Sequence, residues 1–127
     1  MIDEGATLVP LAVVAMPPEV DAVSAGPLRD EFLSTLNRGG VHLVVDARRV
    51  TFMDSSGVNA LVRARERAVR LGGSVHVVTT ARPVLRVLRV AQMLHVMSVL
   101  STMEEAWDCI SRPALIHSCD AGRSSNL

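Results

Sequence analysis

The sequence predicts an α/β fold in a single domain, and three observations lead to it. Short β-branched runs alternate with segments of helical periodicity, and the connections between them are short. Nearly half of the 127 residues (49%) are apolar but only 2% are aromatic, so the core must be aliphatic. Strands and helices that alternate in this way are typical of parallel strands joined by helical crossovers.

The first part of the chain shows the alternation clearly. Residues 8–16 are an almost continuous apolar run, which indicates a buried strand. The stiff turn PPEVD follows, because proline restricts the backbone and cannot donate to a strand ladder. Helical spacing over 24–36 predicts a helix with Pro27 in its first turn, where proline is tolerated. The glycine pair at 39–40 is expected to end that helix.

The rest of the chain continues the pattern. The expected elements are a strand at 41–47, a helix from Asp54 or Ser55 to Leu71, a strand at 74–79, a helix at 82–94, a strand at 96–100 and a last helix from about 101. A glycine pair at 72–73 is expected to end the second helix. The residues after Arg112 are mixed and mostly polar. We therefore expect one domain at 1–111 and a flexible C-terminal tail at 112–127.

Composition excludes several classes of function. The formal net charge is zero, so the molecule as a whole has no electrostatic bias toward nucleic acid or anionic lipid. The chain has no lysine, which excludes a Walker-type phosphate loop and Schiff-base chemistry. The apolar run near the N-terminus follows Asp3 and Glu4 rather than positive charge, and it is too short to span a bilayer. We expect a strand there and a cytoplasmic protein.

A serine hydrolase is disfavoured by the surroundings of Ser55. A nucleophile elbow has the pattern Gly-x-Ser-x-Gly, and Met53 stands where the first glycine would fall. Histidine is the usual catalytic base of such a site, and of the four histidines His42 and His76 lie inside expected strands. Imidazoles that are half-buried and hydrogen-bonded are the simpler interpretation, and we expect no enzymatic activity.

Four potential metal ligands lie close together near the C-terminus. Cys109, His117, Cys119 and Asp120 do not have a recognised zinc spacing. Two late cysteines also do not make a disulfide framework, so a reducing cytosol is the simpler interpretation. We expect neither a metal nor another cofactor.

Six arginines are spaced to share helix faces, as two sets: Arg63, Arg67 and Arg70, and Arg82, Arg86 and Arg89. Two solvated helix faces explain this spacing, and so does a surface that docks a partner. Nucleic acid is a poorer choice because no aromatic residues between the arginines offer a stacking platform.

The segment Asp54-Ser55-Ser56-Gly57 stands where a helix is expected to begin. As a cap, Asp54 or Ser55 would accept a hydrogen bond from an amide without an intrahelical partner, which contributes about 1 kcal/mol. Gly57 in the first turn costs about 1 kcal/mol, because glycine is a poor helix former. A simple cap does not require this glycine, whereas a surface that another protein's backbone approaches closely does.

A hydroxyl at a helix start also suits regulation by phosphorylation. A phosphate would add about −1.5 to −2 charge beside the positive end of the helix dipole, so the folded domain tolerates it. A partner packed against the helix would meet a bulky dianion next to Asp54. These properties predict a switch on binding that leaves the fold stable.

The segment LVVDARRVTFMDSSGVNALVRARERAVRLGGSVHVV, residues 43–78, resembles the signature strand, turn and helix of STAS domains of the anti-sigma factor antagonist family. The likeness extends more loosely over about 5–110, where Glu19-Val20-Asp21 resembles the family's acidic turn. The resemblance implies a single STAS-like α/β domain. Its mixed central sheet would have four to five strands, with about four helices mainly on one face.

The resemblance also implies a mechanism. Members bind an anti-sigma factor, often a serine kinase of the histidine-kinase-like ATPase type, and thereby release its sigma factor. The kinase would phosphorylate Ser55, and a PP2C-type phosphatase would restore it. ATP and Mg²⁺ would belong to the kinase, so this protein would be substrate and ligand rather than enzyme, with no direct contact to nucleic acid or membrane.

The implied partner-binding residues are Asp21, Asp54, Ser55, Ser56, Gly57 and Asn59. Two alternatives stay open at this point. One is a STAS interaction module of another system, a stressosome scaffold or a lipid-transport accessory, whose serine is never modified. The other is a small enzyme that uses Ser55 as its nucleophile.

Overall fold

The structure is a computed structural model, and it describes residues 11–111. The strands are β1 (Leu11–Ala15), β2 (Glu19–Val20), β3 (His42–Asp46), β4 (Phe52–Met53), β5 (Ser74–Val78) and β6 (Ser98–Leu100). The helices are α2 (Ala22–Asn37), α3 (Ser55–Arg70), α4 (Arg82–Val90) and α5 (Met103–Ser111). The predicted α/β class is confirmed, while the expected tail at 112–127 lies outside the described residues.

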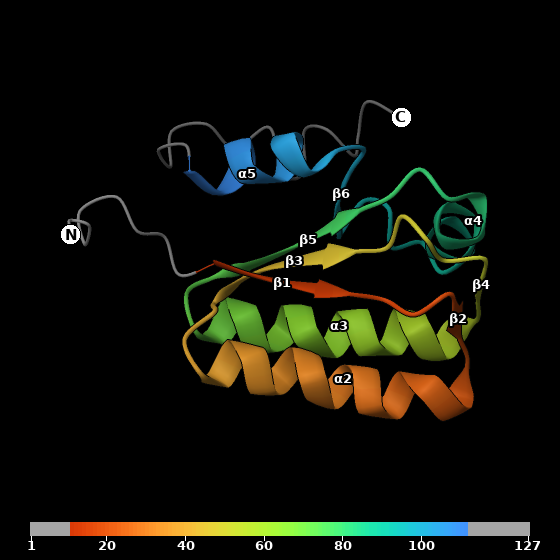
Figure 1. The fold of residues 1–127 in the computed structure, drawn as a ribbon, viewed down its shortest axis with the longest axis horizontal. Helices are drawn as coiled ribbons and strands as arrows, with labels where there is room; N and C mark the ends of the chain where they lie inside the picture. The colour runs from red at the N-terminus through yellow and green to blue at the C-terminus, as the bar shows by residue number, and fades with distance from the viewer. Residues whose placement is uncertain (1–10, 112–127) are drawn as a thin grey trace.

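The main sheet has the strand order β1-β3-β5-β6. All of its described pairings are parallel, so the mixed pairing that we expected does not occur among residues 11–111. Helices α2 and α3 cover one face side by side, and α5 covers the other (Figure 1). Helix α4 lies at the end of the sheet near β4. No described helix is both long enough and apolar enough to cross a bilayer.

Helix α2 begins two residues earlier than the sequence pattern predicted. Asp21 is its N-cap, and the Asp21 carboxylate accepts hydrogen bonds from the amides of Val23 and Ser24. Pro27 therefore lies in the second turn and not in the first. Its ring removes one intrahelical hydrogen bond, and the carbonyl that loses this bond belongs to Val23, which is 84% exposed and can be solvated instead.

Helices α2 and α3 end just before the glycine pairs that were expected to end them. Gly39 and Gly72 have φ values of 110° and 81°, the left-handed conformation that ends a helix and that glycine adopts without steric cost. Helix α4 differs, because it ends at Val90 and not at 94. Gln92 takes the left-handed position with φ 60°, and the amide of Met93 donates to Leu88 O at 2.8 Å, which closes the helix.

A second, two-stranded sheet joins β2 to β4 in parallel, with Val20 opposite Met53. The sequence pattern did not predict either strand, because each has only two residues. The pair is continued by backbone hydrogen bonds from Thr51 N to Pro18 O (2.7 Å) and from Asp54 N to Val20 O (3.1 Å). This small sheet holds the segments before α2 and α3 against each other.

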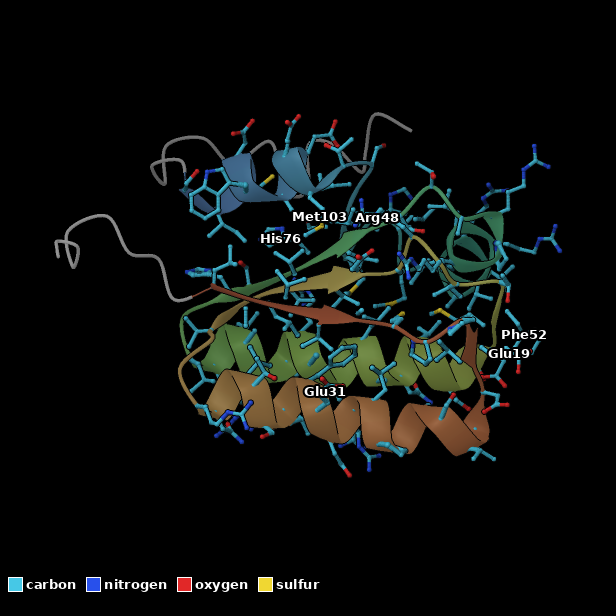
Figure 2. The ribbon with its side chains drawn as sticks, in the orientation of Figure 1. Glu19, Glu31, Arg48, Phe52, His76 and Met103 are labelled. Carbon is cyan, nitrogen blue, oxygen red and sulfur yellow. The ribbon has the colours of Figure 1, made fainter. Side chains whose placement is uncertain are left out.

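Two apolar clusters lie on opposite faces of the main sheet (Figure 2). The larger cluster fills the space between the sheet and the first three helices, with Phe32, Leu43 and Leu61 fully buried. The smaller cluster lies under α5 and includes Val44 and Ala106. The core is aliphatic, as the composition predicted.

A row of hydrogen-bonded polar side chains crosses the α5 face of the sheet. Ser74 Oγ lies 2.9 Å from His42 Nδ1 and 2.8 Å from His76 Nε2. His76 Nδ1 lies 2.8 Å from Ser98 Oγ. Two of these contacts join residues directly opposite each other on neighbouring strands. The two histidines are therefore satisfied within the sheet, as expected (His76 is labelled in Figure 2).

Gly57 makes the contact between the first turn of α3 and the β2–β4 pair. A Cβ at Gly57 would lie 2.8 Å from Met53 Cγ and 2.9 Å from Val20 Cγ1. Both distances are shorter than real Cβ contacts, so a side chain here would push the helix away from the pair. The absence of a side chain at Gly57 therefore sets how closely α3 approaches β2 and β4.

We expect Gly57→Val to lower the free energy of unfolding by about 1–3 kcal/mol, the usual cost of overpacking a tightly packed site. The matched control is Asn59→Val, which places the same side chain on the same helix at an exposed position and should change stability by no more than about 0.5 kcal/mol. Urea unfolding followed by circular dichroism measures both. Equal stability of the two variants would contradict the internal role of Gly57.

We expect the stability of the domain to fall as the pH is lowered from about 7.5 to 5.5. Burial lowers the pKa of His42 below its ordinary value of 6.5, so the unfolded chain binds a proton at a higher pH than the folded chain does. The favourable contribution of neutral His42 is therefore present above pH 6.5 and is lost as the pH falls through the folded-state pKa.

Thermal unfolding at a series of pH values tests this expectation. His42→Gln, which keeps a polar partner for Ser74 but does not titrate, should have a shallower dependence of melting temperature on pH. An unchanged slope in His42→Gln would show that His42 does not carry the effect.

Candidate functional site

The candidate site lies where α2 and α3 begin side by side. Val20 and Met53 are opposite each other in the β2–β4 pair, and the next residue along each strand is a helix N-cap, Asp21 or Asp54. Both helices therefore start at the same end of the molecule (Figure 1). Five of the six predicted partner-binding residues lie on α3 or at its cap, and the pairing brings the sixth, Asp21, to the same end.

Asp54 accepts hydrogen bonds from other residues of the motif. It has extended backbone angles, and its Oδ1 accepts a hydrogen bond from the amide of Ser56 at 2.8 Å. Its carbonyl also accepts from the amide of Gly57 at 3.0 Å. Of the two caps that the sequence allowed, the structure has Asp54, and Ser55 is the first helical residue. The capping carboxylate leaves the Ser55 hydroxyl unused by the cap.

The motif's polar side chains differ in exposure. Ser55 is exposed, whereas Ser56 and Asp54 are half-buried. Asn59 is exposed one turn further along α3. A protein that approaches the start of α3 from solvent therefore reaches Ser55 more readily than Ser56.

Gly57 is buried, and the sequence-based explanation of this glycine was a surface open to a partner's backbone. The structure provides a different reason, because the missing side chain leaves room for Met53 and Val20. This internal packing accounts for the glycine without a partner. Contact between a partner and the Gly57 backbone stays a prediction.

Asp21 forms a capping box at the start of α2. Its carboxylate accepts from Val23 N and Ser24 N, both at 3.0 Å, and Ser24 Oγ accepts from Asp21 N at 3.0 Å. The hydrogen bond from the backbone of Ser24 is the main cause that lowers the pKa of the Asp21 carboxyl group. Asp21 is therefore a fixed negative charge beside the Ser55 turn at neutral pH.

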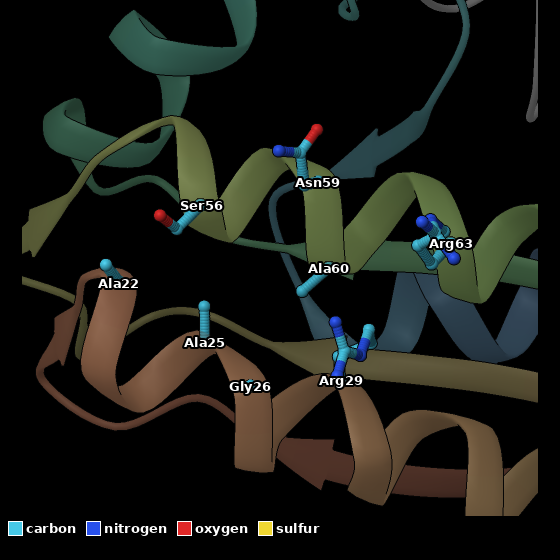
Figure 3. Close-up of a pocket in the computed structure, with 8 residues that line it drawn as sticks. All are labelled: Ala22, Ala25, Gly26, Arg29, Ser56, Asn59, Ala60 and Arg63. Carbon is cyan, nitrogen blue, oxygen red and sulfur yellow. The ribbon is translucent and has the colours of Figure 1, made fainter.

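A polar groove runs between α2 and α3, roughly along the first half of each helix (Figure 3). Its volume is about 370 Å³, and it is lined by Ala22, Ala25, Gly26, Arg29, Ser56, Asn59, Ala60 and Arg63. Ser56 lines one end and the side chains of Arg29 and Arg63 line the other. Two of the predicted site residues, Ser56 and Asn59, therefore belong to this groove, and Ser55 lies beside it.

The first arginine set that the sequence pattern suggested is divided among different roles. Arg63 lines the groove, whereas Arg67 Nε donates to Asn37 Oδ1 at 2.8 Å and ties α3 to α2. Arg70 is exposed in the last turn of α3. The set on α4 is exposed throughout, so a solvated face and a docking surface both stay open there.

Two exposed apolar side chains near the site were missed by the sequence analysis. Phe52, 50% exposed, lies opposite Glu19 in the β2–β4 pair (Figure 2), and Val23, 84% exposed, lies in the first turn of α2. An aromatic ring two residues before the motif is a signal that could have been recognised, since exposed aromatic residues often anchor interfaces. The exposure of Val23 could not be read, because it depends on where α2 begins.

Within residues 11–111 the hydrogen-bonded histidines lie away from Ser55, and the possible metal ligands are not gathered into a group. The histidines that hydrogen-bond hydroxyl groups, His42 and His76, contact Ser74 and Ser98 on the face of the sheet opposite α3. Among residues 11–111 no group of three or more His, Cys, Asp or Glu side chains is placed to hold a metal. Of the four suggested ligands, Cys109 is half-buried on α5, and His117, Cys119 and Asp120 lie outside the described residues.

Solved structures of similar fold come from several bacteria. An anti-sigma factor antagonist from Mycobacterium paratuberculosis has a TM-score of 0.73 at 22% identity, covering 80% of this chain and 86% of that one. A STAS domain protein described as an anti-sigma-factor antagonist from Planctomyces limnophilus has a TM-score of 0.70 at 20% identity, covering 80% and 92%. The unphosphorylated form of SpoIIAA has a TM-score of 0.65 at 23% identity, covering 76% and 84%. At these identities the likeness shows the fold.

The sequence comparisons assign the family. No curated protein matches the chain. The model of the STAS domain matches residues 5–106, which includes both helix starts, the β2–β4 pair and the Asp54–Gly57 turn. The chain therefore belongs to the STAS domain family.

Proposed function

We propose that this protein is an anti-sigma factor antagonist. It binds an anti-sigma factor through the surface around the starts of α2 and α3, and this binding releases the sigma factor. The anti-sigma factor is a serine kinase of the histidine-kinase-like ATPase type, and it ends the interaction by phosphorylating Ser55. A PP2C-type phosphatase reverses the modification. The protein works in the cytoplasm as ligand and substrate, and it needs no cofactor of its own.

The observation that carries this proposal is the position of Ser55. It is the exposed hydroxyl of the motif, at the first residue of α3, while the neighbouring Asp54 carboxylate is held by the amide of Ser56. A kinase can thus reach the Ser55 oxygen without opening the cap. The similar SpoIIAA structure is of that protein's unphosphorylated form, and the structural relatives named above are anti-sigma factor antagonists.

The geometry also supports a phosphate that acts on binding and spares the fold. A dianion on Ser55 would lie at the positive end of the α3 dipole, which stabilises negative charge. The same dianion would join Asp54 and Asp21, both N-caps at this end of the molecule. A docked partner would then face a concentrated negative charge, and like charges across an interface cost several kcal/mol.

The partner can be captured directly. Immobilised protein is incubated with lysate of its own host, with and without ATP, and the retained proteins are identified by mass spectrometry. We expect an anti-sigma factor to be retained without ATP and lost with it. Retention of stressosome or transporter components instead would favour the alternative STAS interaction module.

We expect the captured kinase and ATP to add one phosphate to the wild-type protein and none to Ser55→Ala. Ser56→Ala is the matched control, because it removes the neighbouring hydroxyl and leaves Ser55 in place; it should accept the phosphate. Intact-mass measurement distinguishes the three proteins. Incorporation into Ser55→Ala at the wild-type level would refute the assignment of the site.

We expect Ser55→Glu to weaken binding of the anti-sigma factor by about tenfold or more, since a like-charge contact costs at least about 1.4 kcal/mol. Ser55→Ala should bind as the wild type does. Titration calorimetry measures the affinities, and thermal melts should show that Ser55→Glu keeps its stability. Equal affinity of the Glu and Ala variants would mean that charge at Ser55 does not control binding.

A further inference from the structure

We infer that the groove between α2 and α3 binds an acidic segment of the anti-sigma factor. This inference rests on the proposed function and adds the chemistry by which the partner is recognised. It assigns a binding role to Arg29, which the sequence pattern did not indicate, and to Arg63, which belongs to an arginine set for which the sequence left a docking surface open.

Charge is the first argument. Two guanidinium groups from different helices, Arg29 and Arg63, line the same end of the groove, and none of the lining residues is acidic (Figure 3). Arg29 contacts its neighbour Asp30 at 3.4 Å, but both side chains are exposed and such pairs contribute little. Within the described part of the chain Arg63 forms no ion pair. The groove thus presents positive charge that is not neutralised inside it.

Shape is the second argument. Much of the remaining lining is small, with alanines on both helices and Gly26 on α2, so a side chain or a stretch of backbone can enter. A Cβ at Gly26 would meet nothing within 4 Å, so this position adds open space to the groove. Pro27 provides a local reason for the glycine, because a Cβ before proline disfavours helical angles.

The lining also favours a protein segment over an enclosed small molecule. Small-molecule sites are mostly lined by large apolar and aromatic side chains with a few polar groups. Here the lining consists of polar side chains, alanines and a glycine. Carboxylates on a peptide suit two arginines, because guanidinium and carboxylate groups form paired hydrogen bonds.

Position is the third argument. Ser56 and Asn59 line the groove, and Ser55 is adjacent to it in sequence and at the same helix start. The groove is therefore continuous with the proposed partner surface. A phosphate on Ser55 would lie at the Ser56 end of the groove, and it would repel those acidic residues of the segment that come within a Debye length of it, about 8 Å at physiological salt. This repulsion would connect the modification directly to loss of the partner.

The test uses an oligoglutamate peptide as the probe and ¹⁵N-labelled protein of full length. We expect amide chemical shifts to change mainly at Ala22, Gly26 and Asn59, and the apparent affinity to fall with added salt. Arg63→Gln should lower the affinity for the peptide by about three- to tenfold, as loss of a charge-assisted pair does. Arg70→Gln, which removes the same charge from the other end of α3, is the matched control and should bind as the wild type does.

Several results would overturn the inference. One is that oligoglutamate causes no localised chemical-shift changes, and another is that oligoglutamine causes equal ones. A third is that Arg63→Gln and Arg70→Gln lower the affinity for oligoglutamate equally. Shifts with inorganic phosphate but none with oligoglutamate would identify a small-anion site instead. The peptide titration does not need the kinase, so it tests the groove even if no anti-sigma factor is captured. If an anti-sigma factor is captured and binds Arg63→Gln as tightly as the wild type, the groove is not part of the surface that binds it.

Discussion

The parallel pairing of β2 with β4 is the constraint on which the site depends. Each strand has two residues, and Val20 lies opposite Met53. Because the strands run in the same direction, the residues that follow them, Asp21 and Asp54, emerge at the same edge and each caps a helix. The pairing therefore fixes the two caps relative to each other, and the direct packing of α2 on α3 supplies the residues that line the groove.

Some residues of the Asp54–Gly57 motif stabilise the start of α3, whereas Ser55 forms part of the exposed surface. Asp54 caps α3 through the amide of Ser56, and Gly57 lets the helix approach Met53 and Val20. Ser55 takes part in neither contact and is exposed. A substitution at Asp54 or Gly57 therefore changes the position of the helix start, whereas a change at Ser55 alters the charge of the surface. This division is the physical basis of the proposed switch, which would act on binding and leave stability largely unchanged.

Much of the fold could be predicted because it depends on local pattern. Apolar β-branched runs marked the strands of the main sheet, and the glycines at 39 and 72 marked helix ends by their left-handed conformation. The start of α2 was placed too late, because helical spacing was seen only from residue 24, whereas the capping box of Asp21 and Ser24 starts the helix at Ala22. Strands β2 and β4 were missed because a pair of two-residue strands has no periodicity to detect, and their pairing is a contact between distant segments.

The amino-acid sequence by itself determined the α/β class, the helix start at the Asp-Ser-Ser-Gly turn and the family resemblance, since these follow from hydrophobic periodicity and from a short motif. Only the tertiary structure decided that Gly57 faces Met53, that Asp21 lies at the same end as Asp54, and that Arg29 and Arg63 line one groove. The physical reason is that these relations join residues more than thirty positions apart, or depend on which face of a helix packs inward. Local sequence preferences do not encode such distances, and the packing of the whole core sets them.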